Sequence, residues 1–282
     1  MVEPSATEMG LTRRQLLMWI EHALDPLDPH NNMAMTYEIA GPVDADRFRM
    51  AFEHVVRSTE ALRTIFHAKD GEASQSFPEA TVIRHEYVDL TGVGLQAWMN
   101  ARILRPFDLS VRAYDSVLLR AGPSSFVWYL CQHHIITDGW SFSLIYHRVE
   151  DAYRRLATEN SPVSRGPQFS AYVGFELKFR ASPAFDAGLE YWRTKLLPPP
   201  PALSFYGRSN PGGAHRLHRK TLTLDASRTA QLWKHIEHPD IFILSSPLSR
   251  LVVLLTVLTA YLSRITGESD ITVAVPMLNR GR

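Results

Sequence analysis

The chain has 282 residues, 45% of them hydrophobic, which suits one large domain or two lobes with a buried core. Its 30 basic side chains nearly balance 29 acidic ones, so it lacks the one-signed field that nonspecific binding to nucleic acid or a membrane needs. The single cysteine, Cys131, excludes an internal disulfide and a four-cysteine zinc site. It also fits a reducing cytoplasm. The first ten residues carry Glu3 and Glu8 and no apolar stretch, so no signal peptide is expected.

The N-terminal half predicts alternating helices and strands. Thr12-Arg-Arg-Gln15 is a capping box that begins a helix, and Asp25-Pro26 ends that helix. The further elements expected here are a strand over 35–39, a helix capped by Asp44, strands over 62–67 and 74–77 around the turn Lys69-Asp70-Gly71, a helix over 93–104, and paired strands over 114–119 and 125–134 around Gly122-Pro123.

The C-terminal half predicts helices first and then a change in composition. An amphipathic helix begins at Gly139 or Ser141, and two more cover 169–179 and 185–196. Residues 196–213, rich in proline and glycine, predict an exposed linker or long surface loop. After them we expect strands over 220–224 and 270–275, a helix capped by Asp225, and an apolar helix over 246–265 whose core, 251–262, is too short for a membrane span and therefore buried. The alternation indicates α/β layers.

The strand that ends in two histidines presents them to opposite sides. Side chains alternate between the faces of a strand, so His134 shares a face with Leu130 and Gln132, whereas His133 shares the other with Cys131. One histidine can therefore face a site while the other supports the backbone behind it. Adjacent histidines on a strand are also a poor metal pair, and the sequence has no phosphate-binding glycine motif.

The segment His133-His-Ile-Ile-Thr-Asp-Gly139 resembles the signature of condensation domains of nonribosomal peptide synthetases, within the chloramphenicol acetyltransferase-like superfamily. Five further segments are similar to segments of that family, in the same order along the chain. They are Leu11–Trp19, Asp25–Met33, Arg57–Phe66 (with Ser58 where a histidine is usual), Tyr191–Leu196 and Val273–Arg282. The resemblance implies an α/β fold of two lobes, with a complete first lobe over 1–178 and, over 179–282, a linker and the first part of a partial second lobe.

The resemblance also implies a function and a set of residues. The reaction is amide formation between a donor acyl or peptidyl thioester and the amine of an acceptor aminoacyl thioester, both on carrier proteins. His134 is the expected base or positioning group for that amine, and His133 supports it. Asp138 is expected to pair with Arg280, or with Arg282, and Gly139 keeps the donor path open. The further residues implied are Trp140 and Ser141 as substrate contacts and Arg63 as structural support.

Several alternatives remain open from the sequence. His134 can act as a base or by positioning, and Asp138 as a second proton carrier. The product can be an ester instead of an amide, and epimerisation uses the same histidines. A carrier-binding remnant without catalysis is another possibility, since the family pattern continues beyond Arg282. No resident cofactor or metal is implied, because phosphopantetheine arrives on the carriers. Adjacent adenylation and carrier domains are possible partners, and a cytoplasmic location is expected.

Overall fold

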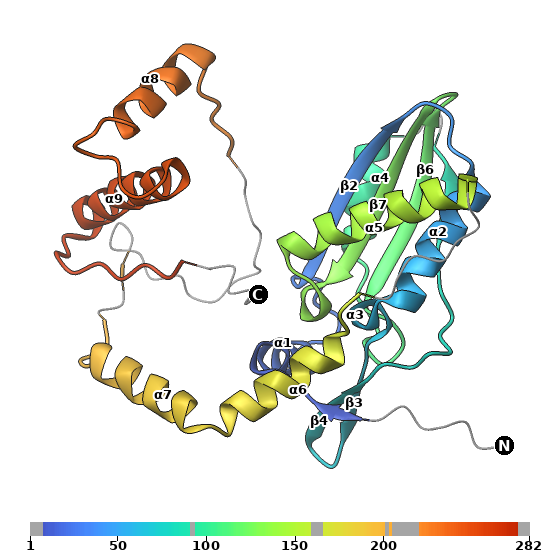
Figure 1. The fold of residues 1–282 in the computed structure, drawn as a ribbon, viewed down its shortest axis with the longest axis horizontal. Coiled ribbons are helices and arrows are strands. Elements are labelled where there is room, and N and C mark those ends of the chain that lie inside the picture. Colours follow the sequence, from blue (N-terminus) through green and yellow to red (C-terminus); the bar gives the residue numbers. More distant parts are fainter. Residues whose placement is uncertain (1–7, 91–93, 159–165, 201–202, 205–219, 276–282) are drawn as a thin grey trace. The chain divides into compact units, whose positions relative to one another are not determined.

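The computed structural model describes residues 8–90, 94–158, 166–200, 203–204 and 220–275 (Figure 1). By its contacts the chain divides into two compact units, 1–186 and 187–282. The expected lobe boundary after residue 178 falls within helix α6 (Phe169–Arg180), whereas the division falls within α7 (Pro183–Lys195). The assignment of the two units to two acyltransferase lobes therefore stays a prediction.

A four-stranded sheet forms the centre of the first unit. Its order is β2-β7-β6-β5, with β5 parallel to β6 and the other neighbours antiparallel. The expected hairpin of two long strands is confirmed. The strand bounds are β2 (Asn32–Ala40), β5 (Glu86–Asp89), β6 (Tyr114–Gly122) and β7 (Ser125–His133).

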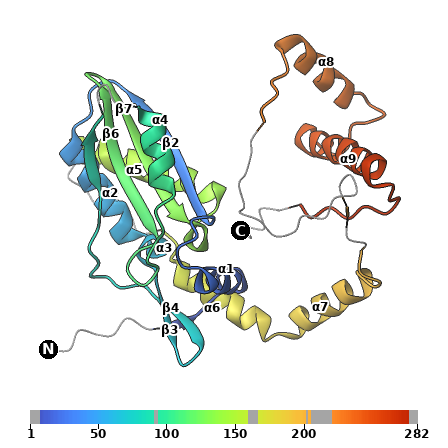
Figure 2. The same ribbon diagram turned by 180° about the vertical axis from the view of Figure 1, so that it is seen from behind.

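Helices cover both faces of this sheet (Figures 1 and 2). On one face α2 (Ala45–Ser58) and α5 (Gly139–Thr158) pack over Trp128 and Leu130 of β7. On the other face α4 (Leu95–Ile103) packs over Val127, Tyr129 and Cys131. The alternation expected for β7 is thus confirmed, and the strand lies between two apolar layers.

The N-terminal helix begins as the sequence predicts. Gln15 N–H donates to the Thr12 hydroxyl at 3.2 Å and Thr12 N–H donates to the Gln15 amide oxygen at 3.0 Å, which completes the capping box of α1 (Arg13–Leu24). A small sheet of order β1-β4-β3 accompanies it. Its strands are β1 (Met9–Gly10), β3 (Ile65–Lys69) and β4 (Glu72–Ser76), with Asp70 and Gly71 in the positive-φ conformation of the turn.

One boundary in this region was wrong. The expected strand over 62–67 begins only at Ile65, because residues 60–63 form the short helix α3 (Glu60–Arg63). The Thr64 hydroxyl donates to the Glu60 carbonyl at 3.0 Å, which satisfies an acceptor at the helix end before the chain becomes extended.

The second unit contains the last two helices, α8 (Ala226–Ile236) and α9 (Ser246–Thr266). Asp225 caps α8 as expected. The predicted strands over 220–224 and 270–275 are wrong, since both segments are irregular and pair with no strand in the described part of the chain. A lone extended segment lacks the ladder hydrogen bonds that make a strand. Most of the predicted linker over 196–213 lies outside the described residues.

The prediction that the apolar helix is buried was also wrong. Within α9 only Ser249 is buried, and Leu254 and Val257 are exposed. The helix α9 is long and apolar enough to cross a membrane. Core helices of soluble proteins can have the same length and composition. The hydrophobic pattern predicted this helix correctly, but it did not predict that the helix is exposed.

Candidate active site

The two histidines lie where the central strand of the first unit ends. His133 is the last residue of β7 and pairs with Asn32 of β2, and its N–H donates to the Ala113 carbonyl at 2.9 Å. His134 begins a 3-10 turn over His134–Ile136, so the expected strand to 134 ends one residue early. The His134 N–H still donates to the Asn31 carbonyl at 2.8 Å, which ties the start of the turn to β2.

His133 is a buried, neutral histidine. Its side chain is 3% exposed, and its ring meets those of His22 and Phe107 edge-on, with centroids 5.5 and 6.4 Å away. Burial, reinforced by His22 and His30, lowers the pKa of His133 to about 3. Its Nδ1 accepts a hydrogen bond from the Ile135 N–H at 3.2 Å, so the ring proton is on Nε2.

His134 has the opposite arrangement of ring nitrogens. Its Nδ1 lies 2.7 Å from the Thr137 carbonyl oxygen. A carbonyl only accepts, so Nδ1 carries the proton and donates, and in the neutral ring Nε2 keeps its lone pair. The side chain is half-buried, in contrast to His133. The contact within the turn therefore fixes both the orientation of the imidazole and the nitrogen that is able to accept a proton.

Asp138 and Ser141 organise the start of α5. The Asp138 carboxylate accepts from the Ser141 N–H at 2.8 Å and from the Ser141 hydroxyl at 2.6 Å. This is the geometry of a helix N-cap, and a negative charge there also favours the helix dipole. Because the hydroxyl proton is directed at the carboxylate, Ser141 offers a substrate only its oxygen lone pairs.

Gly139 and Trp140 follow at the first turn of α5. A Cβ at Gly139 would meet no atom of the described residues within 4 Å. Trp140 is 50% exposed and does not belong to the buried core of the first unit. Their proposed contacts with substrate stay predictions.

Of the three arginines named from the sequence, the structure describes only Arg63. Arg280, expected to pair with Asp138, lies outside the described residues, as does its alternative Arg282. Arg63 lies in α3, is 5% exposed, and donates from Nη1 to the carbonyls of Phe77 and Pro78 at 3.1 and 2.7 Å. It thus holds the segment after β4.

Covalent catalysis by the cysteine is disfavoured by its surroundings. Cys131 is 2% exposed and lies on the α4 face of β7, and burial raises the pKa of its thiol to about 12. Among the described residues no group of three or more His, Cys, Asp or Glu side chains is arranged to hold a metal ion.

Sequence reasoning missed the groups that hold His134 in place. Two of them are the main-chain carbonyls of Thr137 and Asn31. Every residue has such a carbonyl, so residue types do not identify these acceptors. A third, the Asn32 side chain, belongs to the first residue of β2, and only the family resemblance of Asp25–Met33 pointed to this region.

Solved structures with this fold define the class of protein. The chain matches the first condensation domain of the calcium-dependent antibiotic synthetase with a TM-score of 0.77 and 25% identity, over 95% of this chain and 64% of that one. It matches the starter condensation domain of rhizomide synthetase with a TM-score of 0.71 and 24% identity, over 97% and 63%. The fold is therefore the α/β fold of condensation domains.

Sequence comparison leads to the same class. Residues 5–282 match the Condensation domain family, and the chain belongs to that family. It is 32% identical to an isonitrile lipopeptide synthase of Streptomyces coeruleorubidus, over 95% of this chain and 19% of that protein. It is 29% identical to a dimodular nonribosomal peptide synthase of Bacillus subtilis, over 97% and 11%. The chain thus spans less than a fifth of these relatives and under two thirds of the solved domains.

Proposed function

We propose that this chain carries out condensation. The acyl or peptidyl group of a donor thioester is transferred to the amine of an aminoacyl thioester, with both substrates held on carrier proteins. The observation that carries the proposal is the 2.7 Å hydrogen bond from His134 Nδ1 to the Thr137 carbonyl, because it leaves Nε2 as an acceptor on a half-buried ring. An ammonium group cannot attack a thioester, so an acceptor for its proton is what this reaction requires.

The chemistry follows from this acceptor. The amine nitrogen attacks the thioester carbonyl carbon while His134 Nε2 accepts a proton from it or aligns it. The tetrahedral intermediate then collapses, the C–S bond breaks, and the thiolate of the donor arm leaves and takes up the proton. A general base contributes about 10²- to 10⁴-fold in rate, and alignment alone contributes a comparable factor. The N-terminal end of α5, which begins at Gly139, favours negative charge on the intermediate.

The partners and setting follow from the same proposal. The donor and acceptor carriers bring their own phosphopantetheine arms, so the domain needs no resident cofactor. Adenylation and carrier domains are the natural neighbours of such a unit. A cytoplasmic location is consistent with the single cysteine, Cys131, which has no partner for an internal disulfide.

A second candidate is a domain that binds carriers without catalysis. One observation favours it: in the described helices of the second unit, the only buried side chains are Ile236 and Ser249. So little burial leaves these helices with few contacts to hold them rigid. The intact histidine turn of the first unit favours the enzyme, and activity separates the two candidates.

The test uses loaded donor and acceptor carriers with product detection by intact-protein mass spectrometry. We expect product from the wild-type chain and a fall of about 10²- to 10⁴-fold in rate for His134→Ala. The matched control is His147→Ala, which removes a histidine of α5 that is 67% exposed. Circular dichroism establishes that each variant is folded. A folded wild-type chain that binds both carriers and makes no product contradicts condensation and supports the second candidate. The product mass distinguishes an amide from an ester or an epimer.

A further inference from the structure

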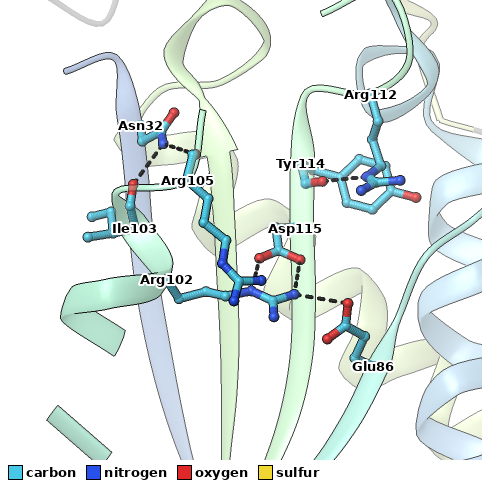
Figure 3. A network of polar contacts seen from close by, with 8 residues as sticks. All are labelled: Asn32, Glu86, Arg102, Ile103, Arg105, Arg112, Tyr114 and Asp115. Carbon is cyan, nitrogen blue, oxygen red and sulfur yellow. Dashed lines mark hydrogen bonds and ion pairs between the residues drawn. The ribbon is translucent and has the colours of Figure 1, made fainter. Parts of the chain in front are cut away.

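Asn32 lies directly across from His133, at the first residue of β2. Its side-chain amide nitrogen donates two hydrogen bonds, to the Ile103 carbonyl at 2.7 Å and to the Arg105 carbonyl at 2.8 Å (Figure 3). Ile103 is the last residue of α4 and Arg105 follows two residues later, so both carbonyls lie where the chain leaves the helix and acceptors lack partners inside it. One side chain therefore ties the C-terminal end of α4 to the beginning of β2.

The tied segment continues onto the buried histidine. Two residues after Arg105 comes Phe107, whose ring meets that of His133 edge-on at 6.4 Å. Farther from the histidines, α4 is held to the sheet by Arg102, which pairs with Asp115 of β6 at 2.8 Å and with Glu86 of β5 at 3.0 Å (Figure 3). The Asn32 amide is the anchor at the end of α4 that leads to His133.

From this point two connections reach His134. His133 accepts from the Ile135 N–H, which fixes the turn that His134 begins. The Asn31 carbonyl, one residue before Asn32, accepts the His134 N–H at 2.8 Å. The Asn32 side chain therefore supports His134 from two directions, through the backbone of β2 and through the ring of His133.

We infer that Asn32 is a positioning residue for the reaction at His134. This inference rests on the proposed condensation activity. Asn32 holds the main chain and the buried neighbour of His134, so its loss displaces the imidazole without removing any chemical group from the site. A displacement of about 1 Å costs on the order of 10²-fold in rate. We expect Asn32→Ala to lower kcat by about 10- to 100-fold and to change KM by less than about threefold, because only the reacting geometry is altered.

The experiment combines turnover with two measurements of His134 itself. Amide hydrogen exchange reports the His134 N–H bond to Asn31, and ¹⁵N-histidine NMR reports the ring tautomer. In Asn32→Ala we expect exchange at the His134 amide to accelerate at least tenfold more than at Tyr129, in the centre of the same strand. The control is Gln96→Ala, which removes an amide of α4 that donates to the Asn100 side chain at 2.8 Å, one turn later. It should match the wild type in all three measurements.

The outcomes separate this inference from the proposed function. If Asn32→Ala keeps kcat and His134 exchange within twofold of wild type, the positioning role is overturned while condensation stands. If the wild-type chain makes no product, condensation fails, and the exchange and tautomer measurements still decide whether Asn32 positions His134. If Asn32→Ala does not fold, Phe107→Leu replaces it. A selective change at His134 in that variant supports the inference, and an unchanged His134 overturns it.

Discussion

Strand β7 and the turn after it are held by different kinds of interaction. Every residue of β7 after Ser125 is buried, and the strand is enclosed by two neighbouring strands and by helices on both faces. In the turn over 134–139, by contrast, hydrogen bonds between near neighbours hold the side chains of His134 (to Thr137) and Asp138 (to Ser141), and the His134 N–H adds a bond to the Asn31 carbonyl of the neighbouring chain segment. Long-range packing thus determines where the site lies, and local hydrogen bonds determine how its groups are oriented.

The largest loss of stability is expected from a substitution in β7. Trp128 is 1% exposed, packs against Phe48 and Tyr37, and donates from Nε1 to the Ser116 hydroxyl at 3.0 Å. Trp128→Ala should lower the free energy of unfolding by about 3–5 kcal/mol, through lost burial and a cavity. Chemical denaturation measures the change. Trp140→Ala, at a half-exposed tryptophan in the turn region, should change it by less than about 0.5 kcal/mol. Similar losses in the two variants contradict the comparison.

At the junction between β7 and the turn, His133 should make the stability of the fold depend on pH. The folded-state pKa of His133 is lowered to about 3, below its ordinary value of 6.5, so the unfolded chain takes up a proton first as pH falls. The stability associated with neutral His133 is therefore present above pH 6.5 and is lost as pH falls from there toward 3. One such group contributes a slope of about 1.4 kcal/mol per pH unit.

His133→Asn isolates this slope. Asparagine retains a polar atom near the position of Nδ1 and does not titrate in this range. Urea denaturation between pH 7 and 4.5 should give a curve shallower by about one proton than that of wild type. His147→Asn, at an exposed position, should leave the slope unchanged. An unaltered slope in His133→Asn indicates that the folded and unfolded chains protonate His133 over the same pH range, which contradicts a lowered pKa.

The smallest change in the free energy of unfolding is expected from substitutions in the turn. Asp138→Ala removes the acceptor for the N–H and the hydroxyl of Ser141 and should lower the free energy of unfolding by about 0.5–2 kcal/mol as a lost helix cap. Asp138→Asn keeps an acceptor oxygen and should lose less. Ser141→Ala keeps the N–H bond and should lose about half as much as Asp138→Ala. Denaturation followed by circular dichroism ranks the three variants, and equal losses contradict a capping role.

Local signals predicted much of the first unit. The capping box at Thr12, the cap at Asp44 and the turn at Asp70-Gly71 depend on contacts within a few residues, and all three are present. The alternation of side chains over 126–131 of β7 is also confirmed, because the period of two follows from backbone geometry alone. Apart from strand bounds at 62–64 and 134, the wrong predictions lie in the second unit, over 220–224, 251–262 and 270–275, where the outcome depends on which partner packs against a segment.

The sequence by itself determined the family, the strand that ends at His133, and the alternation of side chains between the two faces of that strand. These features follow from a motif and from local backbone periodicity. Only the tertiary structure showed that His133 accepts at Nδ1 whereas His134 donates from Nδ1, and that Asn32 connects the end of α4 to their strand. Ring tautomers and main-chain acceptors depend on atoms brought together by folding, and residue identity does not encode them one position at a time.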